Sequence, residues 1–216
     1  MEHSVCISRA DIDDMDRVHR LKLINGLSGF KSANLIGTGS KEDGENLAVF
    51  SSFIHLGSDP PLLGCILRPN TVPRHTWNNI KSEGWYTVNH INEDIYEQAH
   101  QTSGKYHKEI SEFDVSDLTP WYSKKCTAPY VNESRINIGL KPIEKHMIEA
   151  NQTMLLVGSI QEVWLNRSFI DTDGFLDIEK AGTVAVSGLD GYHSTSLLDK
   201  LDYVRVENEK SREEKE

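Results

Sequence analysis

Residues 46–53 read NLAVFSSF, and residues 58–63 read SDPPLL. The first stretch is an apolar run that ends in small hydroxyl side chains, a pattern typical of a short strand that finishes at a polar turn. The two prolines of the second stretch force a break in regular structure. Residues 62–67 are apolar again and predict another strand. The sequence therefore predicts two neighbouring strands whose ends carry polar groups.

The rest of the chain repeats this pattern of short β-like runs between turn residues. Residues 39–46 have the composition of a turn, so residues 32–38 and 47–53 predict a hairpin. Further strands are predicted at residues 84–90, 154–164 and 183–187, and short helices at residues 74–82 and 94–101. The long helices that a doubly wound parallel sheet requires are missing. The pattern favours a mainly β fold, a barrel or sandwich of antiparallel strands with a few short helices.

The composition is that of a globular protein with a single domain. The chain has 216 residues, of which 38% are hydrophobic and 26% charged, so wholesale disorder is excluded. No apolar run approaches the roughly 20 residues that span a bilayer, and residues 1–6 lack the features of a secretion signal. We therefore expect a cytoplasmic protein. The net charge of −10 argues against nucleic acid or an anionic membrane as a partner.

Several familiar chemistries find no support in the motifs. Residues 37–39 (GTG) lack the third glycine of a dinucleotide-binding turn, and a strand follows where a helix is needed. The sequence contains neither a phosphate-binding loop of the nucleotidase kind nor the G-x-S-x-G of serine hydrolases. The nine histidines and three cysteines show no ligand spacing, so we expect no metal site. Cys65, within an apolar run, is predicted to be a buried core residue.

A cluster of hydroxyl and basic side chains at two strand ends is the stronger signal. The cluster consists of Ser51, Ser52, Arg68, Arg74, His75 and Thr76. A phosphate monoester needs neutral donors for its oxygens and one or two cations to balance its charge. The cluster could supply both. Basic clusters are also common on solvated surfaces, so the residues alone leave both interpretations open.

The order of several motifs resembles the flavin reductase-like FMN-binding family. In that family an N-x-A-x-x-S-x-F strand leads through a D-P-P turn into a strand that ends near an arginine, as residues 46–68 do here. Residues 74–80 (RHTWNNI) resemble the family's segment that opens a short helix, and residues 85–91 (WYTVNHI) resemble its next strand. Residues 128–134 (APYVNES) are similar to its A-P-x-x-x-E-S strand. The likeness runs from about residue 21 to about residue 203.

This resemblance implies an FMN-binding split β-barrel, an antiparallel Greek-key barrel with a few short flanking helices. It implies a domain at residues 21–205, after an N-terminal extension at residues 1–20 and before a charged tail at residues 206–216. The strand ends would hold the phosphate of FMN, and other residues would lie near the ring or close over the site. The implied cofactor-binding residues are Lys31, Asn46, Phe50, Ser51, Ser52, Phe53, Arg68, Arg74, His75, Thr76, Asn89, Ser103 and Lys105, with Tyr106 beside them. No catalytic residue and no metal ligand is implied.

The resemblance also implies an activity and partners. NAD(P)H would reduce the bound FMN, which would pass electrons to free flavin or another acceptor, and the hydride chemistry would belong to the cofactor. Members of the family form homodimers with FMN near the subunit interface, an arrangement that also covers exposed sheet edges. One alternative is a flavin-binding electron-transfer protein that a protein partner reduces without nicotinamide. A third interpretation is a phosphate-binding module without redox chemistry.

Overall fold

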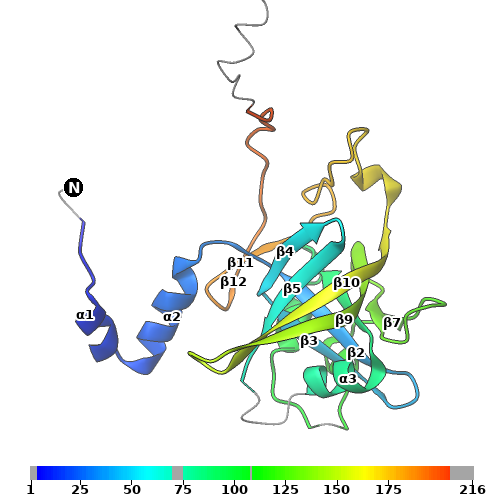
Figure 1. The fold of residues 1–216 in the computed structure, drawn as a ribbon, viewed down its shortest axis with the longest axis horizontal. Helices are drawn as coiled ribbons and strands as arrows, with labels where there is room; N and C mark the ends of the chain where they lie inside the picture. Colours follow the sequence, from blue (N-terminus) through cyan, green and yellow to red (C-terminus); the bar gives the residue numbers. More distant parts are fainter. Residues whose placement is uncertain (1–3, 70–74, 108, 205–216) are drawn as a thin grey trace, which may run out of the picture.

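Seven antiparallel strands form the main sheet of the protein. The computed structural model describes residues 4–69, 75–107 and 109–204. The hydrogen-bonded order of the strands is β3-β2-β6-β9-β10-β5-β4 (Figure 1). Their bounds are β2 (Asn34–Ser40), β3 (Gly44–Phe50), β4 (Phe53–Ser58), β5 (Pro61–Leu67), β6 (Tyr86–His90), β9 (Ile136–Ile148) and β10 (Thr153–Leu165). The prediction of a mainly β fold with antiparallel strands is confirmed.

The sheet curls around an apolar interior, to which five of its strands contribute. This interior cluster contains Ile36, Cys65, Leu67, Ile80, Tyr86, Val88, Leu140, Met154 and Leu156. Cys65 is fully buried in it, as predicted, and burial raises the pKa of the Cys65 thiol to about 12. A second core cluster lies between the sheet and the short helices α4 (Tyr96–Gln101) and α5 (Glu112–Ser116). The sheet is therefore packed on both sides near β2 and β3.

The predicted hairpin exists, and its turn at residues 41–43 lies inside the predicted range of residues 39–46 but is shorter. β2 and β3 pair from Asn34 opposite Phe50 to Ser40 opposite Gly44, so both glycines of the GTG stretch belong to β2. Gly37 is needed there because a Cβ atom would collide with the Pro129 carbonyl. Gly39 adopts φ +84°, a backbone conformation that glycine tolerates best. Composition therefore placed the turn correctly but made it too long at both ends.

β9 was not predicted from the sequence, and neither was the break between β3 and β4. β9 spans 13 residues and pairs with both β6 and β10, yet its sequence includes Pro142 and several charged residues. Its outer half, from Lys141 to Ile148, is mostly exposed, so no apolar alternation marks it. The strand predicted at residues 47–53 proved to be two strands, because β3 ends at Phe50 and β4 begins at Phe53.

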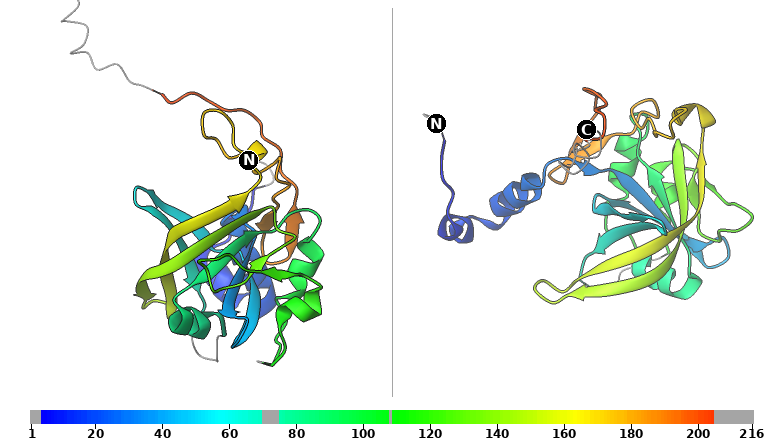
Figure 2. Two further views of the ribbon diagram at one scale, coloured as in Figure 1. Left: turned by 90° about the vertical axis from the view of Figure 1, so that its right-hand side faces the viewer. Right: turned by 45° about the horizontal axis from the view of Figure 1, so that its top comes forward.

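An N-terminal arm of two helices, α1 (Arg9–Asp14) and α2 (Arg17–Leu27), extends away from the barrel (Figures 1 and 2). Each helix begins at a side-chain cap: Ser8 forms a capping box with Asp11, and Asp16 accepts from two backbone N–H groups of α2. Such caps satisfy donors that the first turn leaves free. Neither helix has a buried residue. The arm is therefore held by local hydrogen bonds more than by packing.

The remaining elements are short. They are β1 (Lys31–Ser32), α3 (His75–Glu83), β7 (Pro120–Trp121), β8 (Tyr130–Val131), η1 (Arg167–Phe169), β11 (Ala185–Ser187) and β12 (Gly191–His193). β1, β11 and β12 form a small sheet of their own. None of the helices in the described ranges has the length and apolar character needed to cross a bilayer.

His90 at the end of β6 makes folding sensitive to acid. Burial lowers its pKa to about 4, whereas an unfolded histidine titrates near 6.5. Between these values the unfolded chain binds the additional proton, so stability falls as the pH falls through this window. When the pH is lowered from neutral to about 5, the unfolding free energy of the parent protein should fall. In His90→Gln we expect this fall to be smaller by about 1–2 kcal/mol. Urea unfolding of both proteins at several pH values measures this, and equal losses would contradict it.

Candidate functional site

The candidate site lies where the chain passes from one edge strand of the main sheet to the other. β3 and β4 are the first and last strands of the hydrogen-bonded order, and only Ser51 and Ser52 separate them in sequence. In the described pairings these serines lie outside both strand ladders, which end at Phe50 and resume at Phe53. Ser52 Oγ donates a hydrogen bond of 2.9 Å to the Ile66 carbonyl of β5. We call this junction of β3 and β4 the seam.

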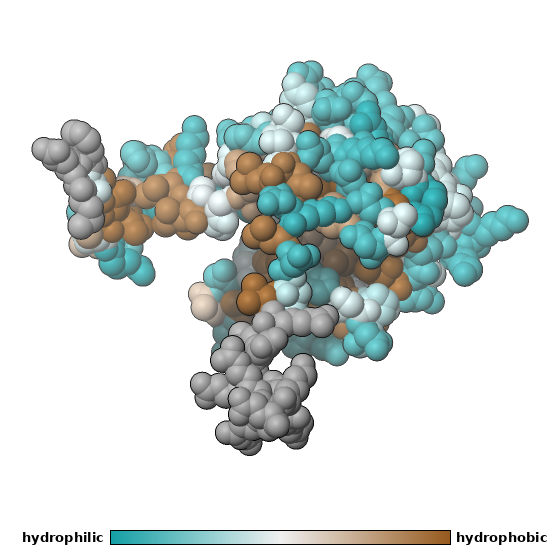
Figure 3. All heavy atoms as spheres, turned by 90° about the horizontal axis from the view of Figure 1, so that it is seen from above, coloured by the Kyte–Doolittle hydropathy of each residue, from teal (hydrophilic) through white to brown (hydrophobic). Residues whose placement is uncertain are grey.

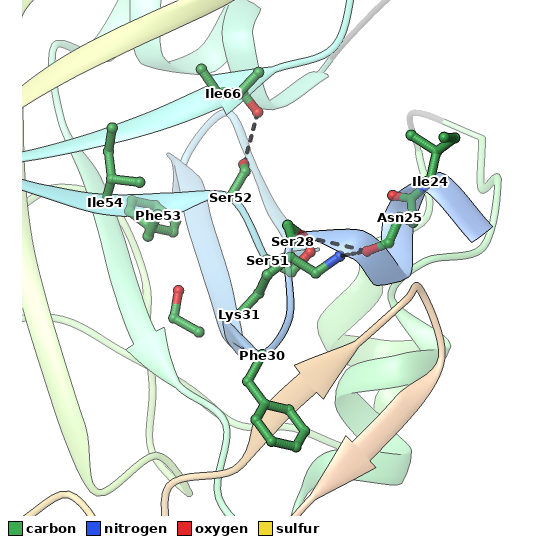
Figure 4. A pocket seen from close by; sticks show the side chains of 11 residues that line it. Ile24, Asn25, Ser28, Phe30, Lys31, Ser51, Ser52, Phe53, Ile54 and Ile66 are labelled. Atoms are coloured by element: carbon green, nitrogen blue, oxygen red, sulfur yellow. Dashed lines mark hydrogen bonds between the residues drawn. The ribbon is translucent and has the colours of Figure 1, made fainter. Parts of the chain in front are cut away.

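A cavity of about 520 Å³ opens beside the seam (Figure 4). Its walls come from the end of α2, from β1, from the seam and from β4 and β5. The lining residues are Ile24, Asn25, Ser28, Phe30, Lys31, Ser32, Ser51, Ser52, Phe53, Ile54 and Ile66. A volume of this size suits a small-molecule ligand. The lining is half polar and half apolar, so it suits a ligand with a polar end and a flat apolar body.

Lys31 supplies the positive charge of the cavity. Its Nζ donates to the Asn25 carbonyl at 3.0 Å and to the Gly188 carbonyl at 2.6 Å. The first carbonyl belongs to the last turn of α2, where a cation also interacts well with the helix dipole. The second lies in the turn between β11 and β12. An ammonium group has three donors, so one N–H remains for a ligand.

The hydroxyl groups of the cavity differ in what they can still donate. The only proton of Ser52 Oγ is used on Ile66, so this oxygen is left as an acceptor. In the part of the chain that the structure describes, Ser51 Oγ makes no hydrogen bond and is free to donate. Ser32 Oγ accepts from Asn34 Nδ2 at 3.0 Å and keeps its own proton. Ser51, Ser32 and Lys31 can therefore donate to an anion.

Other predicted residues gather on the α3 side of β3, away from the lining of the cavity. Asn46 Nδ2 lies 3.4 Å from Thr76 Oγ1, so these two predicted residues are brought together. Glu112 on α5 accepts from the Leu47 N–H at 2.9 Å. Burial raises the pKa of the Glu112 carboxyl, and the charge of nearby His75 acts in the opposite direction. Asn46, His75 and Thr76 thus belong to one cluster of polar side chains. The cluster also contains the carboxylate of Glu112, which the sequence analysis did not single out.

The structure places the remaining predicted residues apart from the cavity. Asn89 is fully buried, and its side chain bonds to the Leu35 carbonyl, to Thr87 and to the Val131 N–H. The other positions are Phe50, half-buried against the barrel interior, and Arg68, Ser103 and Lys105, all exposed. Tyr106 donates to the Gln101 carbonyl at 3.0 Å within its own loop. Arg74 lies outside the described residues.

Sequence reasoning missed the cavity wall that α2 supplies. Ile24 and Asn25 lie in α2, which begins inside the predicted extension of residues 1–20 and ends beyond it, Ser28 follows the last residue of α2, and Phe30 precedes β1. The available signal was the cap residue Asp16 ahead of an apolar-basic stretch at residues 17–27, which is typical of a helix start. Four of the predicted residues, Lys31, Ser51, Ser52 and Phe53, do line the cavity.

Solved structures support the same architecture. A crystal structure from Shewanella frigidimarina, described as a candidate flavin reductase with a split barrel domain, is 45% identical. It aligns with a TM-score of 0.89 over 93% of this chain and 100% of that chain. Nitrilotriacetate monooxygenase component B from Bacillus cereus is 18% identical, with a TM-score of 0.79 over 92% of this chain and 98% of its own. The second likeness shows the fold alone.

Sequence comparisons agree with the structural ones. An uncharacterized protein of Aquifex aeolicus is 29% identical over 56% of this chain, and the match covers 62% of that protein's length. The uncharacterized protein YwrF of Bacillus subtilis is 25% identical over 89% of this chain and 96% of its own. Residues 27–179 match the flavin reductase like domain. The chain is thus a split β-barrel, and it belongs to the flavin reductase like domain family.

Proposed function

We propose that the protein binds FMN in the cavity at the seam and that NAD(P)H reduces this flavin. The family supports a flavin-using oxidoreductase. The observation that carries the choice of FMN is the donor set of the cavity. Lys31, Ser51 and Ser32 can offer one charged and two neutral donors to a phosphate monoester, which is the combination that such a group requires. FMN ends in a phosphate monoester.

The apolar half of the lining fits the flat ring of a flavin. Phe30, Phe53 and Ile54 stand beside Ile24 and Ile66 in the same cavity. Aromatic and aliphatic side chains of this kind exclude water from a ring system and fix its plane. Phe30 is itself held edge-on by His193, with 4.9 Å between the ring centroids. The chain's residues therefore position a flavin and shield one part of it.

A bound flavin would supply hydride and electron transfer, and the chain would supply position and charge. Lys31 and Ser51 balance and bond the phosphate, while Ser52 stays tied to Ile66 and holds the seam together. No side chain is needed as an acid or a base for accepting a hydride. The electron acceptor beyond the flavin is free flavin or another molecule. We also propose that the protein acts as a homodimer, as the resemblance implies.

Anaerobic reduction of the purified, FMN-loaded protein tests the activity. We expect NADH or NADPH to bleach the visible absorbance of the flavin in a stopped-flow instrument, with a rate that saturates as the nicotinamide concentration rises. Dithionite is the control, because it reduces any accessible flavin. If dithionite bleaches the flavin and neither nicotinamide does, the nicotinamide step is refuted and the electron-transfer alternative is favoured. If the protein fails to bind FMN at all, the whole proposal is refuted.

A further inference from the structure

Phe30 lines the flavin cavity, although its place in the chain does little to fix its ring. It lies between α2, which has no buried residue, and β1. Figure 3 shows apolar surface along the arm and again on the body of the molecule beside it. Phe30 is 66% exposed, so burial does not select one orientation of the side chain. An exposed side chain samples several rotamers, and a contact from elsewhere in the fold is needed to hold this ring in one plane.

The contact comes from His193 on β12. The two rings pack edge to face, with 4.9 Å between their centroids and 65° between their planes, a geometry that aromatic pairs prefer. Figure 4 shows the Phe30 ring beside the hairpin of β11 and β12, which is drawn in pale orange. The His193 ring therefore limits how far the Phe30 ring can turn.

The His193 ring is itself fixed within the hairpin. Ser187 Oγ on β11 and His193 Nε2 lie 2.7 Å apart and share a hydrogen bond in which the tautomer decides the donor. Gly191 pairs with Ser187 and leaves the space for this bond. A Cβ atom at Gly191 would lie 2.8 Å from Ser187 Oγ and 3.4 Å from His193 Nε2. The glycine, the serine and the histidine thus form a unit that holds the imidazole in one orientation.

The hairpin is in turn anchored to the body of the protein. Tyr192 points to the opposite face of β12 from His193 and packs against the core cluster between the sheet and the short helices. The Tyr192 hydroxyl lies 3.2 Å from Nδ1 of His100 on α4. Lys31 Nζ donates to the Gly188 carbonyl in the turn of the hairpin. The hairpin therefore connects the core to two successive residues of the cavity wall.

We propose that His193 is a positioning residue for the flavin, because it holds the Phe30 ring in the plane against which the flavin ring packs. This inference rests on the proposed function. Ordering a side chain during binding consumes part of the binding free energy, so a wall that is ordered beforehand gives a tighter complex. The contact acts on the ring of the ligand, so its effect is the same for FMN and for riboflavin. In this it differs from the effect of Lys31, which acts on the phosphate.

A double-mutant cycle of His193→Ala and Phe30→Leu tests the role, with riboflavin and FMN as the probes. We expect His193→Ala to weaken the binding of each flavin by roughly 2- to 10-fold, the cost of ordering one side chain that was free. In the Phe30→Leu background the same change should alter the affinity by less than about 1.5-fold, because the ring that His193 holds is gone. Equal effects of His193→Ala in the two backgrounds would overturn the proposal.

Two further substitutions separate the ring contact from the hydrogen bond. His193→Phe keeps a ring edge against Phe30 and should restore most of the lost affinity. His193→Gln keeps a hydrogen-bonding partner for Ser187 without a ring, and it should bind flavin as weakly as His193→Ala. The visible circular dichroism of the bound flavin should fall in His193→Ala and His193→Gln and return in His193→Phe, since it reports how firmly the ring is held. The matched control is His146→Ala, an exposed histidine of β9 outside the cavity lining, which should bind flavin as the parent does.

The outcomes distinguish this role from the proposed function. Rescue by His193→Gln and not by His193→Phe would overturn the role, because the hydrogen bond and not the ring would then matter. A parent protein that binds both flavins, with His193→Ala binding them equally well, would overturn the role and leave the proposed function standing. A parent protein that binds neither flavin would overturn both.

Discussion

Gly158→Ala is expected to destabilise the protein by about 3 kcal/mol, the upper end of what overpacking costs in a core. Gly158 lies in β10 at a register shift against β9 and faces the barrel interior. A Cβ atom there would overlap the hydroxyl oxygen of Tyr86 and lie 2.8 Å from Tyr86 Cζ and 3.1 Å from Leu140 Cδ2. Tyr86 is fully buried, so it has no free space to move into.

Tyr86→Phe gives this prediction its internal test. Among the described residues, the Tyr86 hydroxyl is a buried group without a hydrogen-bond partner, so its removal should not lower stability and can raise it by about 1 kcal/mol. The double variant should then recover about 1–2 kcal/mol of the loss, because the two sites are in contact. Gly26→Ala in α2, where a Cβ atom meets nothing within 4 Å, is the control and should be neutral or stabilising. Urea unfolding of the four proteins is the measurement, and additive effects of Gly158→Ala and Tyr86→Phe would contradict it.

Lys31→Met is expected to weaken FMN binding by roughly 10- to 100-fold, the value of a charge-assisted hydrogen bond to an anion. The change keeps the length of the side chain and removes the only cation that the described residues contribute to the cavity lining. Ser51→Ala should weaken FMN binding less than Lys31→Met does. Ser52→Ala should weaken it least, because the Ser52 hydroxyl already donates its proton to the Ile66 carbonyl. Fluorescence titration with FMN measures all three dissociation constants.

Riboflavin separates a phosphate contact from a structural role for Lys31. It carries the same ring as FMN without the phosphate, so Lys31→Met should change its affinity by less than about 3-fold. The control is Lys22→Met, an exposed lysine of the neighbouring helix that lies outside the cavity lining, and it should leave both affinities unchanged. A Lys31→Met protein that loses FMN and riboflavin equally would show that the lysine acts by holding α2 and the β11–β12 turn.

The fold was largely predictable because its central strands carry strong local signals. Residues 62–67 and 154–164 are apolar runs, and the structure has β5 and β10 there. β9 was not predictable, since its outer half is exposed and one of its two partners, β6, is distant in sequence. The break between β3 and β4 was also not predictable, because residues 46–53 (NLAVFSSF) are largely apolar on both sides of the two serines. The break depends on tertiary pairing, since β3 pairs with β2 and β4 pairs with β5.

The site was predictable only in part, for a similar reason. Ser51, Ser52 and Phe53 are adjacent in sequence and needed only a strand end to bring them together. The α2 wall joins separate segments of the chain, and the tether from Lys31 to Gly188 in the β11–β12 turn spans 157 positions. Local patterns cannot report such a contact. Asn89 shows another limit, because the resemblance implied a contact from the backbone near it and no local pattern indicated that its side chain bonds to the Leu35 carbonyl and the Val131 N–H.

The seam has a consequence for how this protein can change over generations. Ser51 and Ser52 lie outside the ladders of β3 and β4, and only the Ser52 hydroxyl bonds to another strand, so replacing Ser51 breaks no strand pairing and no such bond among the described residues. Most substitutions elsewhere in the sheet lower stability, and proteins have little stability to lose. Mutations at Ser51 can therefore alter ligand preference at small cost in folding.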